Sequence, residues 1–209
     1  MPAPSSVDAA AIRRASSPAV IGGLAAIWLA MLVLGGRGID HSVLLASHVS
    51  EDTWLRILLA VTRFGDWGLL VAASFFGSAW LMYRRQFGPA LLLLGSTLAG
   101  RLAVSLQKWF LGRVRPESDS PLVDVQSLSF PSGHAANSMI VYLLVALILV
   151  PPGRQRDWAA AAAVTASLLI GASRVPLGLH WPSDVIGGWA FGLLWVLLCL
   201  ALAQRLARD

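Results

Sequence analysis

The chain of 209 residues is 56% hydrophobic and 13% charged, whereas an ordinary soluble domain is about 25% charged. A soluble fold of this length would need more charged side chains to cover its surface. The formal net charge of +5 could suggest nucleic-acid binding, but the basic residues lie between apolar runs and form no basic stripe. We therefore expect a membrane protein without a nucleic-acid partner.

The chain begins with a segment, 1–17, that we expect to lie in the cytoplasm. The apolar run at 15–36 follows Arg13 and Arg14, as a signal peptide would. Its apolar part is longer than the core of a signal peptide, and LGGRGIDHS contains no convincing cleavage site. The sequence therefore predicts a retained membrane anchor.

The next apolar stretch, ILLAVT at 57–62, is too short to cross a bilayer. Arg56 and Arg63 flank it, and this arrangement predicts an interfacial turn of helix. The following runs are long enough to span, since a crossing takes about 17–25 residues with some charge tolerated near the ends. Together with the first run they predict six spans, at 15–36, 67–83, 86–107, 135–153, 158–173 and 185–204.

Six spans leave almost no room for a soluble domain. We therefore predict an all-α, polytopic membrane protein whose six transmembrane helices form one bundle, with a single domain over 18–205. Basic residues of the loops divide equally between the two sides, eight and eight. The compact pairs in YRRQ and PPGRQRD favour a cytoplasmic N-terminus. Loops 109–133 and 174–183 should then face the periplasm or exterior of a bacterial inner membrane.

Three polar motifs fall on that outer face: KWFLGRVRP at 108–116, FPSGH at 130–134 and SRVPLGLHWPSD at 173–184. Each has an ordinary structural explanation: snorkelling cations at a helix end, a capped helix start, and a proline and a carboxylate in a first helical turn. Because successive spans cross the membrane in opposite directions, all three motifs lie on the same face. The spans follow from apolar length and not from the motifs, so this agreement is independent support. The sequence therefore predicts one composite site.

Phosphoryl transfer needs cations, backbone donors, a nucleophile and a proton donor. The three motifs contain cations at Lys108, Arg115 and Arg174. Ser132 and Gly133 open a helix, where free N–H groups and the helix dipole favour an anion. These five residues predict a phosphate-binding site.

His180 and Asp184 are four residues apart near a helix start, so their side chains can meet. A carboxylate on one ring nitrogen orients the imidazole and leaves the other nitrogen to attack. His134 adjoins the glycine turn and can protonate the departing oxygen. Three basic residues would repel a divalent ion and no carboxylate cluster joins the histidines, so we expect neither a metal nor another cofactor.

The arrangement KxxxxxxRP, PSGH and SRxxxxxHxxxD resembles the type 2 phosphatidic acid phosphatase family, the lipid phosphate phosphatases, with every motif position intact. The resemblance implies a six-helix membrane fold and a phosphohistidine intermediate on His180. It also implies His134 as acid and Asp184 as the partner of His180. Phosphate contacts would come from Lys108, Arg115, Ser132, Gly133 and Arg174.

The expected activity is metal-independent hydrolysis of a lipid phosphate or diphosphate, with undecaprenyl diphosphate as the first candidate. Phosphatidylglycerophosphate and phosphatidic acid are alternatives, and lipid A phosphates also fit. An anion-binding transporter is the alternative of another class, and a phosphotransferase or haloperoxidase-like enzyme is the rival within enzymes. Arg101 lies inside a span and on the same helical face as Lys108. It either contributes to a second phosphate or acidic-partner site or snorkels to the interface.

Overall fold

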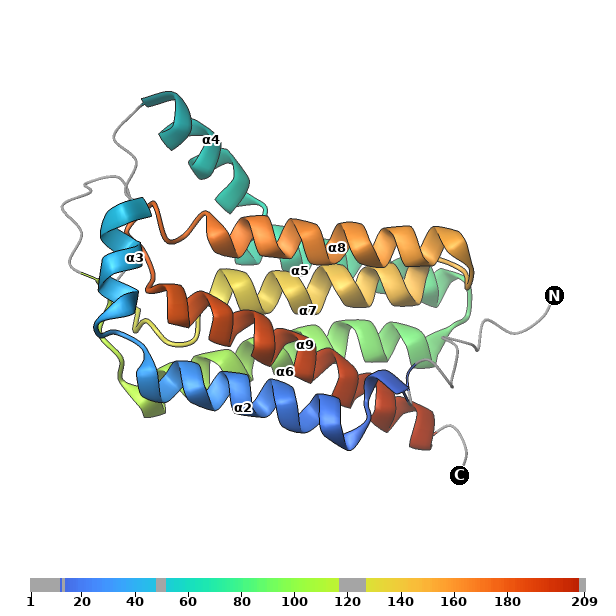
Figure 1. The fold of residues 1–209 in the computed structure, drawn as a ribbon. Helices are drawn as coiled ribbons and strands as arrows, with labels where there is room; N and C mark the ends of the chain where they lie inside the picture. The colour runs from blue at the N-terminus through green and yellow to red at the C-terminus, as the bar shows by residue number, and fades with distance from the viewer. Residues whose placement is uncertain (1–11, 13, 48–51, 117–126, 207–209) are drawn as a thin grey trace.

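The computed structural model describes residues 12, 14–47, 52–116 and 127–206, and these contain helices and no strand (Figure 1). The predicted segment 1–17 and the predicted loop 109–133 lie partly outside the described residues. The helices are α2 (Pro18–Leu34), α3 (Ile39–Ser47), α4 (Asp52–Arg63), α5 (Trp67–Tyr83), α6 (Phe87–Leu111), α7 (Gly133–Leu149), α8 (Arg154–Ala172) and α9 (Pro182–Leu206).

The six predicted spans coincide with α2 and α5 to α9, which lie side by side in one bundle (Figure 1). By length and composition alone, three segments of the described chain could cross a membrane: Asp52–Tyr83, Phe87–Leu111 and Pro182–Leu206. The α2–α3 pair would make a fourth, but it bends by 86°. The all-α bundle agrees with the prediction, and the count of six crossings rests on the parallel arrangement of the helices.

Two helices at one end of the bundle were not predicted in full. The α3 helix was not predicted, and the chain turns into it through Gly36 and Gly38, at φ 79° and 45°. The α4 helix has 12 residues, so it is longer than the interfacial turn predicted at 57–62. Both helices lie at the end of the bundle opposite to the start of α2 and the end of α9 (Figure 1).

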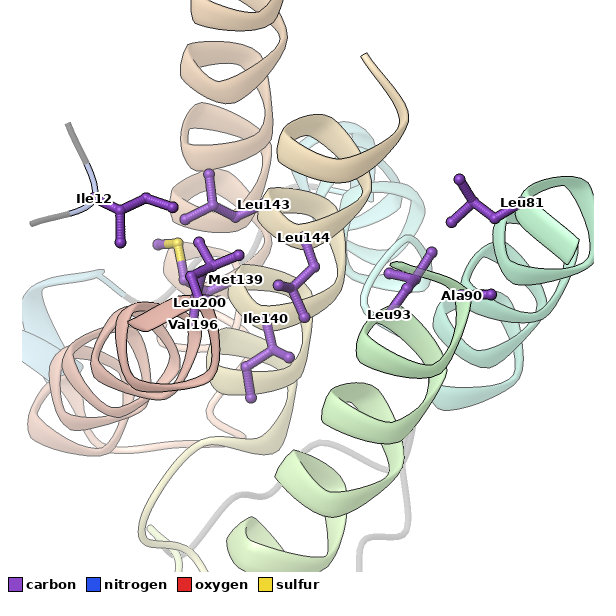
Figure 2. Close-up of a cluster of buried hydrophobic side chains, with 10 residues drawn as sticks. All are labelled: Ile12, Leu81, Ala90, Leu93, Met139, Ile140, Leu143, Leu144, Val196 and Leu200. Atoms are coloured by element: carbon purple, nitrogen blue, oxygen red, sulfur yellow. The ribbon is translucent and has the colours of Figure 1, made fainter. Parts of the chain in front are cut away.

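The α7 helix is the centre of the bundle, because it packs against α5, α6, α8 and α9. Its side chains join residues of the neighbouring helices in the main apolar cluster (Figure 2). This cluster contains Ile12, Leu81, Ala90, Leu93, Met139, Ile140, Leu143, Leu144, Val196 and Leu200. The start of α7 is thereby held at a defined position among the four helices around it.

Two glycines let α9 approach the first half of α7 closely. A Cβ atom on Gly192 would lie 2.7 Å from the carbonyl oxygen of Ala136, and one on Gly188 would lie 2.8 Å from that of Ser132. A spacing of four residues places both glycines on one helix face, as in small-residue contacts between membrane helices. The N–H of Ser132 also donates to the carbonyl oxygen of Asp184 at 2.9 Å. The starts of α7 and α9 are therefore fixed against each other.

The outer faces of the helices carry many large exposed apolar side chains. Leu29, Phe76, Leu91, Leu102 and Leu198 are examples from four different helices. Such a surface would be unfavourable in water, whereas lipid acyl chains solvate it. The exposed residues agree with a bundle surrounded by the hydrocarbon of a bilayer.

We predict that Gly192→Ala lowers the thermal stability of the detergent-solubilised protein, because the added methyl group meets the backbone of α7. Overpacking of this kind costs about 1–3 kcal/mol. Gly95→Ala is the matched control, because a Cβ atom there meets nothing within 4 Å. Alanine also favours the helix by about 1 kcal/mol, so the control should keep or raise the melting temperature. Equal melting temperatures for the two variants would refute the close approach of α7 and α9.

Candidate active site

His180 lies in the loop between α8 and α9, and Asp184 lies in the first turn of α9. The Nδ1 atom of His180 is 3.3 Å from Oδ2 of Asp184. Both side chains are almost completely buried, with residue exposures of 1% and 0%. The structure therefore brings together the pair that the spacing of four residues predicted.

Arg115 determines which nitrogen of His180 carries the proton. Nη1 of Arg115 lies 3.1 Å from Nε2 of His180. A guanidinium group can only donate, so Nε2 must accept and the ring proton must be on Nδ1. Nδ1 then donates to Asp184. The unprotonated Nε2 is thus the nitrogen with a free electron pair, on the side of the ring away from the carboxylate.

The pKa of His180 lies well below its usual range. Burial of the ring is the main cause, and the positive charges of Arg115, Lys108 and Arg174 add to it. The neutral imidazole is therefore the dominant form at neutral pH. A neutral ring with an available electron pair is what a nucleophile at this position requires.

Asp184 has further partners that the sequence did not indicate. Its Oδ1 accepts from Nη1 of Arg113 at 2.9 Å, and its Oδ2 accepts from the hydroxyl of Ser129 and from the N–H of Trp181 at 3.0 Å. All three donors are loop residues. Trp181 is close to Asp184 in the sequence, whereas Arg113 and Ser129 are distant in the sequence and reach Asp184 only in the folded chain. Together they hold the carboxylate in a fixed position beside His180.

Arg113 connects this carboxylate to the first span. Its second guanidinium nitrogen donates to the carbonyl oxygens of Met31 and Leu32 at the end of α2. The guanidinium also lies over the ring of Phe130, 4.4 Å from its centroid. Arg113 was predicted only as a possible snorkelling cation, although it stands two residues before Arg115 in the same motif. That position was the one signal available for its role.

The start of α7 contributes Gly133 and His134 to a cavity, whereas Ser132 lies behind it. Ser132 is completely buried, its N–H donates to Asp184, and its hydroxyl has no hydrogen-bond partner among the described residues. The backbone N–H of Ser132 is therefore already hydrogen-bonded within the protein, whereas the sequence predicted a free N–H group at this helix start. Gly133 and the residues after it retain the unpaired N–H groups of a first helical turn.

His134 has a carboxylate partner that the sequence analysis missed. Its Nε2 lies 3.2 Å from Oδ1 of Asp66, whose side chain is 58% exposed. Asp66 belongs to the turn between α4 and α5, and a Cβ atom on the preceding Gly65 would lie only 2.6 Å from the His134 ring. Because a carboxylate only accepts, Nε2 of His134 carries a proton. Asp66 showed no signal in the sequence beyond its place before a helix.

The two remaining predicted cations reach the site from α6 and from the end of α8. Nζ of Lys108 donates to the carbonyl oxygen of Ser129 at 3.0 Å. Arg174 is 4% exposed, and its Nη1 donates to the hydroxyl of Thr62 at 2.8 Å. Its Nε has no partner among the described residues. Burial, followed by the charge of Arg115, lowers the pKa of Arg174 to about 10, so it stays charged at neutral pH.

A cavity of about 470 Å³ joins these groups, a volume typical of small-molecule sites. Six of the eight predicted site residues line it, while Ser132 and Asp184 lie behind the wall. The lining also includes polar residues that were not predicted as site residues. The main lining residues are Thr62, Arg63, Asp66, Trp67, Arg101, Lys108, Arg115, Gly133, His134, Asn137, Arg174 and His180.

This arrangement can bind a tetrahedral anion, attack it through a ring nitrogen and protonate a departing oxygen. Within the part of the chain that the structure describes, no three His, Cys, Asp or Glu side chains are grouped as metal ligands would be. The donor set of the cavity is cationic, and it suits an anionic substrate better than a metal ion. The geometry brings the three motifs into one site.

The sequence matches the model of the PAP2 superfamily over residues 89–208. Phosphatidylglycerophosphatase B of Bacillus subtilis is 30% identical over 174 residues, which cover 81% of this chain and 85% of that protein. Lipid A 1-phosphatase of Rhizobium johnstonii is 31% identical over 179 residues, covering 80% and 69%. Undecaprenyl-diphosphatase of Sulfolobus acidocaldarius is 27% identical over 139 residues, covering 60% and 65%.

The fold is similar to the crystal structure of a transmembrane PAP2-type phosphatidylglycerolphosphate phosphatase from Bacillus subtilis. The TM-score is 0.81 at 28% sequence identity, with 88% of this chain and 96% of that chain covered. This similarity confirms the predicted all-α membrane fold. It also confirms that the chain is an integral membrane protein.

We predict that His180 stays neutral at pH values where an ordinary imidazole, with a pKa of about 6.5, is half protonated. Its lowered pKa means that the neutral form persists as the pH falls. NMR of ¹³C-labelled histidine in micelles measures this, with His180→Ala as the assignment control. Arg115→Gln should raise the pKa of His180, because it removes the nearest positive charge. A wild-type pKa of His180 at or above 6.5 would contradict the tautomer and charge state described above.

Proposed function

The chain belongs to the PAP2 superfamily, and from this membership we propose that it is a membrane-embedded lipid phosphatase that forms a phosphohistidine intermediate on His180. One observation carries the proposal: His180 has a carboxylate on Nδ1 and an unprotonated Nε2 on the side of a cation-lined cavity. Binding of an anion alone would not need this pairing, which argues against the transporter alternative.

In the first step Nε2 of His180 attacks phosphorus, and the bond between phosphorus and the oxygen of the lipid leaving group breaks. Arg115 donates to Nε2 before the reaction. It must move this hydrogen bond to a phosphate oxygen so that the electron pair becomes available. His134 reacts in its doubly protonated form and gives one of its two ring protons to the departing oxygen, which leaves a neutral imidazole. The products are a phosphorylated His180 and the dephosphorylated lipid.

In the second step a water molecule attacks the phosphohistidine. His134, now a neutral imidazole, takes a proton from the water and becomes doubly protonated again, and the bond between phosphorus and Nε2 breaks. Inorganic phosphate leaves and both histidines return to their starting states. Asp66 stabilises the positive charge of His134 through the contact at 3.2 Å, and Asp184 stabilises that of His180 in the same way.

Charge on the transferred phosphoryl group is balanced by Lys108, Arg115 and Arg174, and by the N–H groups at the start of α7 from Gly133 onward. The partnerless Nε of Arg174 and hydroxyl of Ser132 are further donors next to the cavity. Lys108 and Arg174 are held in advance by hydrogen bonds to Ser129 and Thr62, so they need little reorganisation when the transition state forms. Lys108, Arg115, Gly133 and Arg174 keep their proposed roles as phosphate-binding residues, while Ser132, behind the cavity wall, would act only if its hydroxyl turned toward the phosphate.

The proposed substrate is a lipid, because the site opens among helices whose outer faces contact the bilayer. An acyl or prenyl chain gains about 0.8 kcal/mol per methylene group by staying in apolar surroundings. Undecaprenyl diphosphate is the first candidate from the sequence. Phosphatidylglycerophosphate is the second candidate, because of the similarity to the Bacillus subtilis protein. Phosphatidic acid and lipid A phosphates are the further alternatives. We propose that the site faces the outside of the inner membrane.

We predict that His180→Ala abolishes turnover and any acid-labile phosphoenzyme. His134→Ala should lower the rate on a lipid monophosphate by about 10²–10⁴-fold, the usual contribution of a general acid. The loss should be much smaller on an aryl phosphate whose phenol leaves without a proton. Initial rates with both substrates in mixed micelles measure the difference.

His41→Ala is the control for these variants, since His41 is exposed and does not line the cavity. It should retain the wild-type rate on both substrates. Equal losses for His134→Ala on the good and the poor leaving group would show that His134 is not the acid.

The predicted orientation can be tested with single cysteines in a Cys199→Ala background. Ser42 lies in α3 at the site end of the bundle, and Gln155 lies at the start of α8 at the other end; both are exposed. In intact cells a membrane-impermeant thiol reagent should label Ser42→Cys and not Gln155→Cys, whereas both should react after lysis. The opposite labelling would place the chemistry in the cytoplasm.

A further inference from the structure

The cavity contains more positive charge than one phosphate group can balance. Five cationic side chains line it, from Arg63, Arg101, Lys108, Arg115 and Arg174, against one carboxylate, that of Asp66. Among the described residues none of the five forms an ion pair with a carboxylate. A phosphate monoester carries at most two negative charges at neutral pH. Cations next to a membrane interior are unfavourable unless anions balance them, so the excess charge requires a further explanation.

Two lining cations, Arg63 and Arg101, have no part in the proposed reaction; Arg63 is exposed at the end of α4, whereas Arg101 is half-buried in α6. Arg101 lies seven residues before Lys108 on α6, which places it two helical turns, or about 10.5 Å, deeper along the helix on the same face. Its side chain nevertheless reaches the start of α7. A Cβ atom on Gly133 would lie 3.6 Å from Nη1 of Arg101 and 3.9 Å from Cε of Lys108. The two cations therefore converge on one region from different depths.

Trp67 holds the Arg101 guanidinium in this place, with 5.2 Å between the guanidinium carbon and the ring centroid. Trp67 is the first residue of α5 and also lines the cavity. Of the two explanations that the sequence left open, snorkelling to the lipid interface would place the guanidinium on the outer surface of the bundle. The observed side chain instead lines the cavity with the other cations.

We propose that Arg101 binds a second phosphate group of the substrate, next to the phosphate that is removed. The enzyme would then prefer lipids whose headgroup carries two phosphate groups: a diphosphate, or a phosphomonoester joined through a short linker to a phosphodiester. Either headgroup carries at least one negative charge more than the two of a monoester. The additional charge can balance cations of the cavity that a simple lipid monophosphate leaves unbalanced. This inference rests on the proposed phosphatase function and adds the substrate class.

The test uses two matched substrate pairs in mixed micelles. Undecaprenyl diphosphate is compared with undecaprenyl phosphate, and phosphatidylglycerophosphate is compared with phosphatidic acid of the same acyl chains. Within each pair the lipid chains are the same and only one headgroup carries a second phosphate. In the glycerolipid pair a glycerol also links the two phosphates. The wild-type enzyme should favour the two-phosphate member of at least one pair in kcat/KM. The pair that responds identifies whether the second group is a diphosphate or a phosphodiester.

Arg101→Gln should lower kcat/KM for that preferred substrate by about 10-fold or more, the usual effect of losing a charged hydrogen bond. Its one-phosphate partner should lose clearly less, and Arg101→Lys should restore part of the preference. Arg84→Gln is the matched control, because Arg84 also lies over a tryptophan, Trp80 at 5.6 Å, but does not line the cavity. It should leave both rates unchanged. Equal losses on both members of the pair after Arg101→Gln would overturn the proposal.

A measurement on the wild-type enzyme keeps the test independent of folding of the variant. Methylenediphosphonate should inhibit more strongly than methylphosphonate, and equal inhibition would overturn the proposal. Failure of the proposed function gives a different result. In that case wild type would hydrolyse none of the four lipids, or His180→Ala would remain active. A wild-type enzyme that hydrolyses these lipids through His180 without preferring a second phosphate would refute only the role of Arg101.

Discussion

The buried carboxylate of Asp184 is the group on which the rest of the site depends. It has no exposed surface, and its two oxygens accept from His180, Arg113, Ser129 and the N–H of Trp181. Three of these donors reach Oδ2, and the fourth, Arg113, reaches Oδ1. Breaking a buried ion pair by removing one partner typically costs about 3–5 kcal/mol. Asp184 therefore fixes the ring of His180, the start of α9 and the loop before α7 together.

The glycines of α9 make this polar centre compatible with a membrane bundle. Gly188 and Gly192 bring the backbones of α7 and α9 together, and the bond from Ser132 to Asp184 connects the two helix starts. As a result, two histidines from motifs that are far apart in the sequence line the same cavity. Larger residues at the two glycine positions would push α7 and α9 apart and so separate the motifs, although every chemical group of the motifs would still be present.

Much of the fold and site could be predicted because the relevant information is local. Apolar length defined the spans, and spacing within each motif identified Lys108, His134 and the His180–Asp184 pair. The partners that position these residues were not predictable in this way. Asp66 contacts His134 across 68 positions of the sequence, and Asp40 contacts Ser183 across 143. A single carboxylate in a turn has no periodicity or spacing that would indicate a partner so distant.

The same limitation applies to Arg113 and to the helices at the site end. Arg113 resembles any cation at a helix end until the carbonyl groups of α2 are known to lie beside it. The helices α3 and α4 were underestimated because short, mixed segments resemble loops when apolar length is the criterion. Only the packed structure shows that the last turn of α4 brings Thr62 to Arg174 and that the turn after α4 brings Asp66 to His134.

The contact between Arg113 and α2 shows that the site depends on a part of the chain outside the region matched by the family model. The family match covers residues 89–208, and every predicted site residue lies within it. Yet the guanidinium that balances Asp184 is held by carbonyl oxygens of Met31 and Leu32, from a helix outside that region. A gene fragment encoding only the matched region would contain every motif but lack the carbonyls that hold Arg113. The matched region therefore depends on the first span for the position of Arg113, even though that span shows no motif.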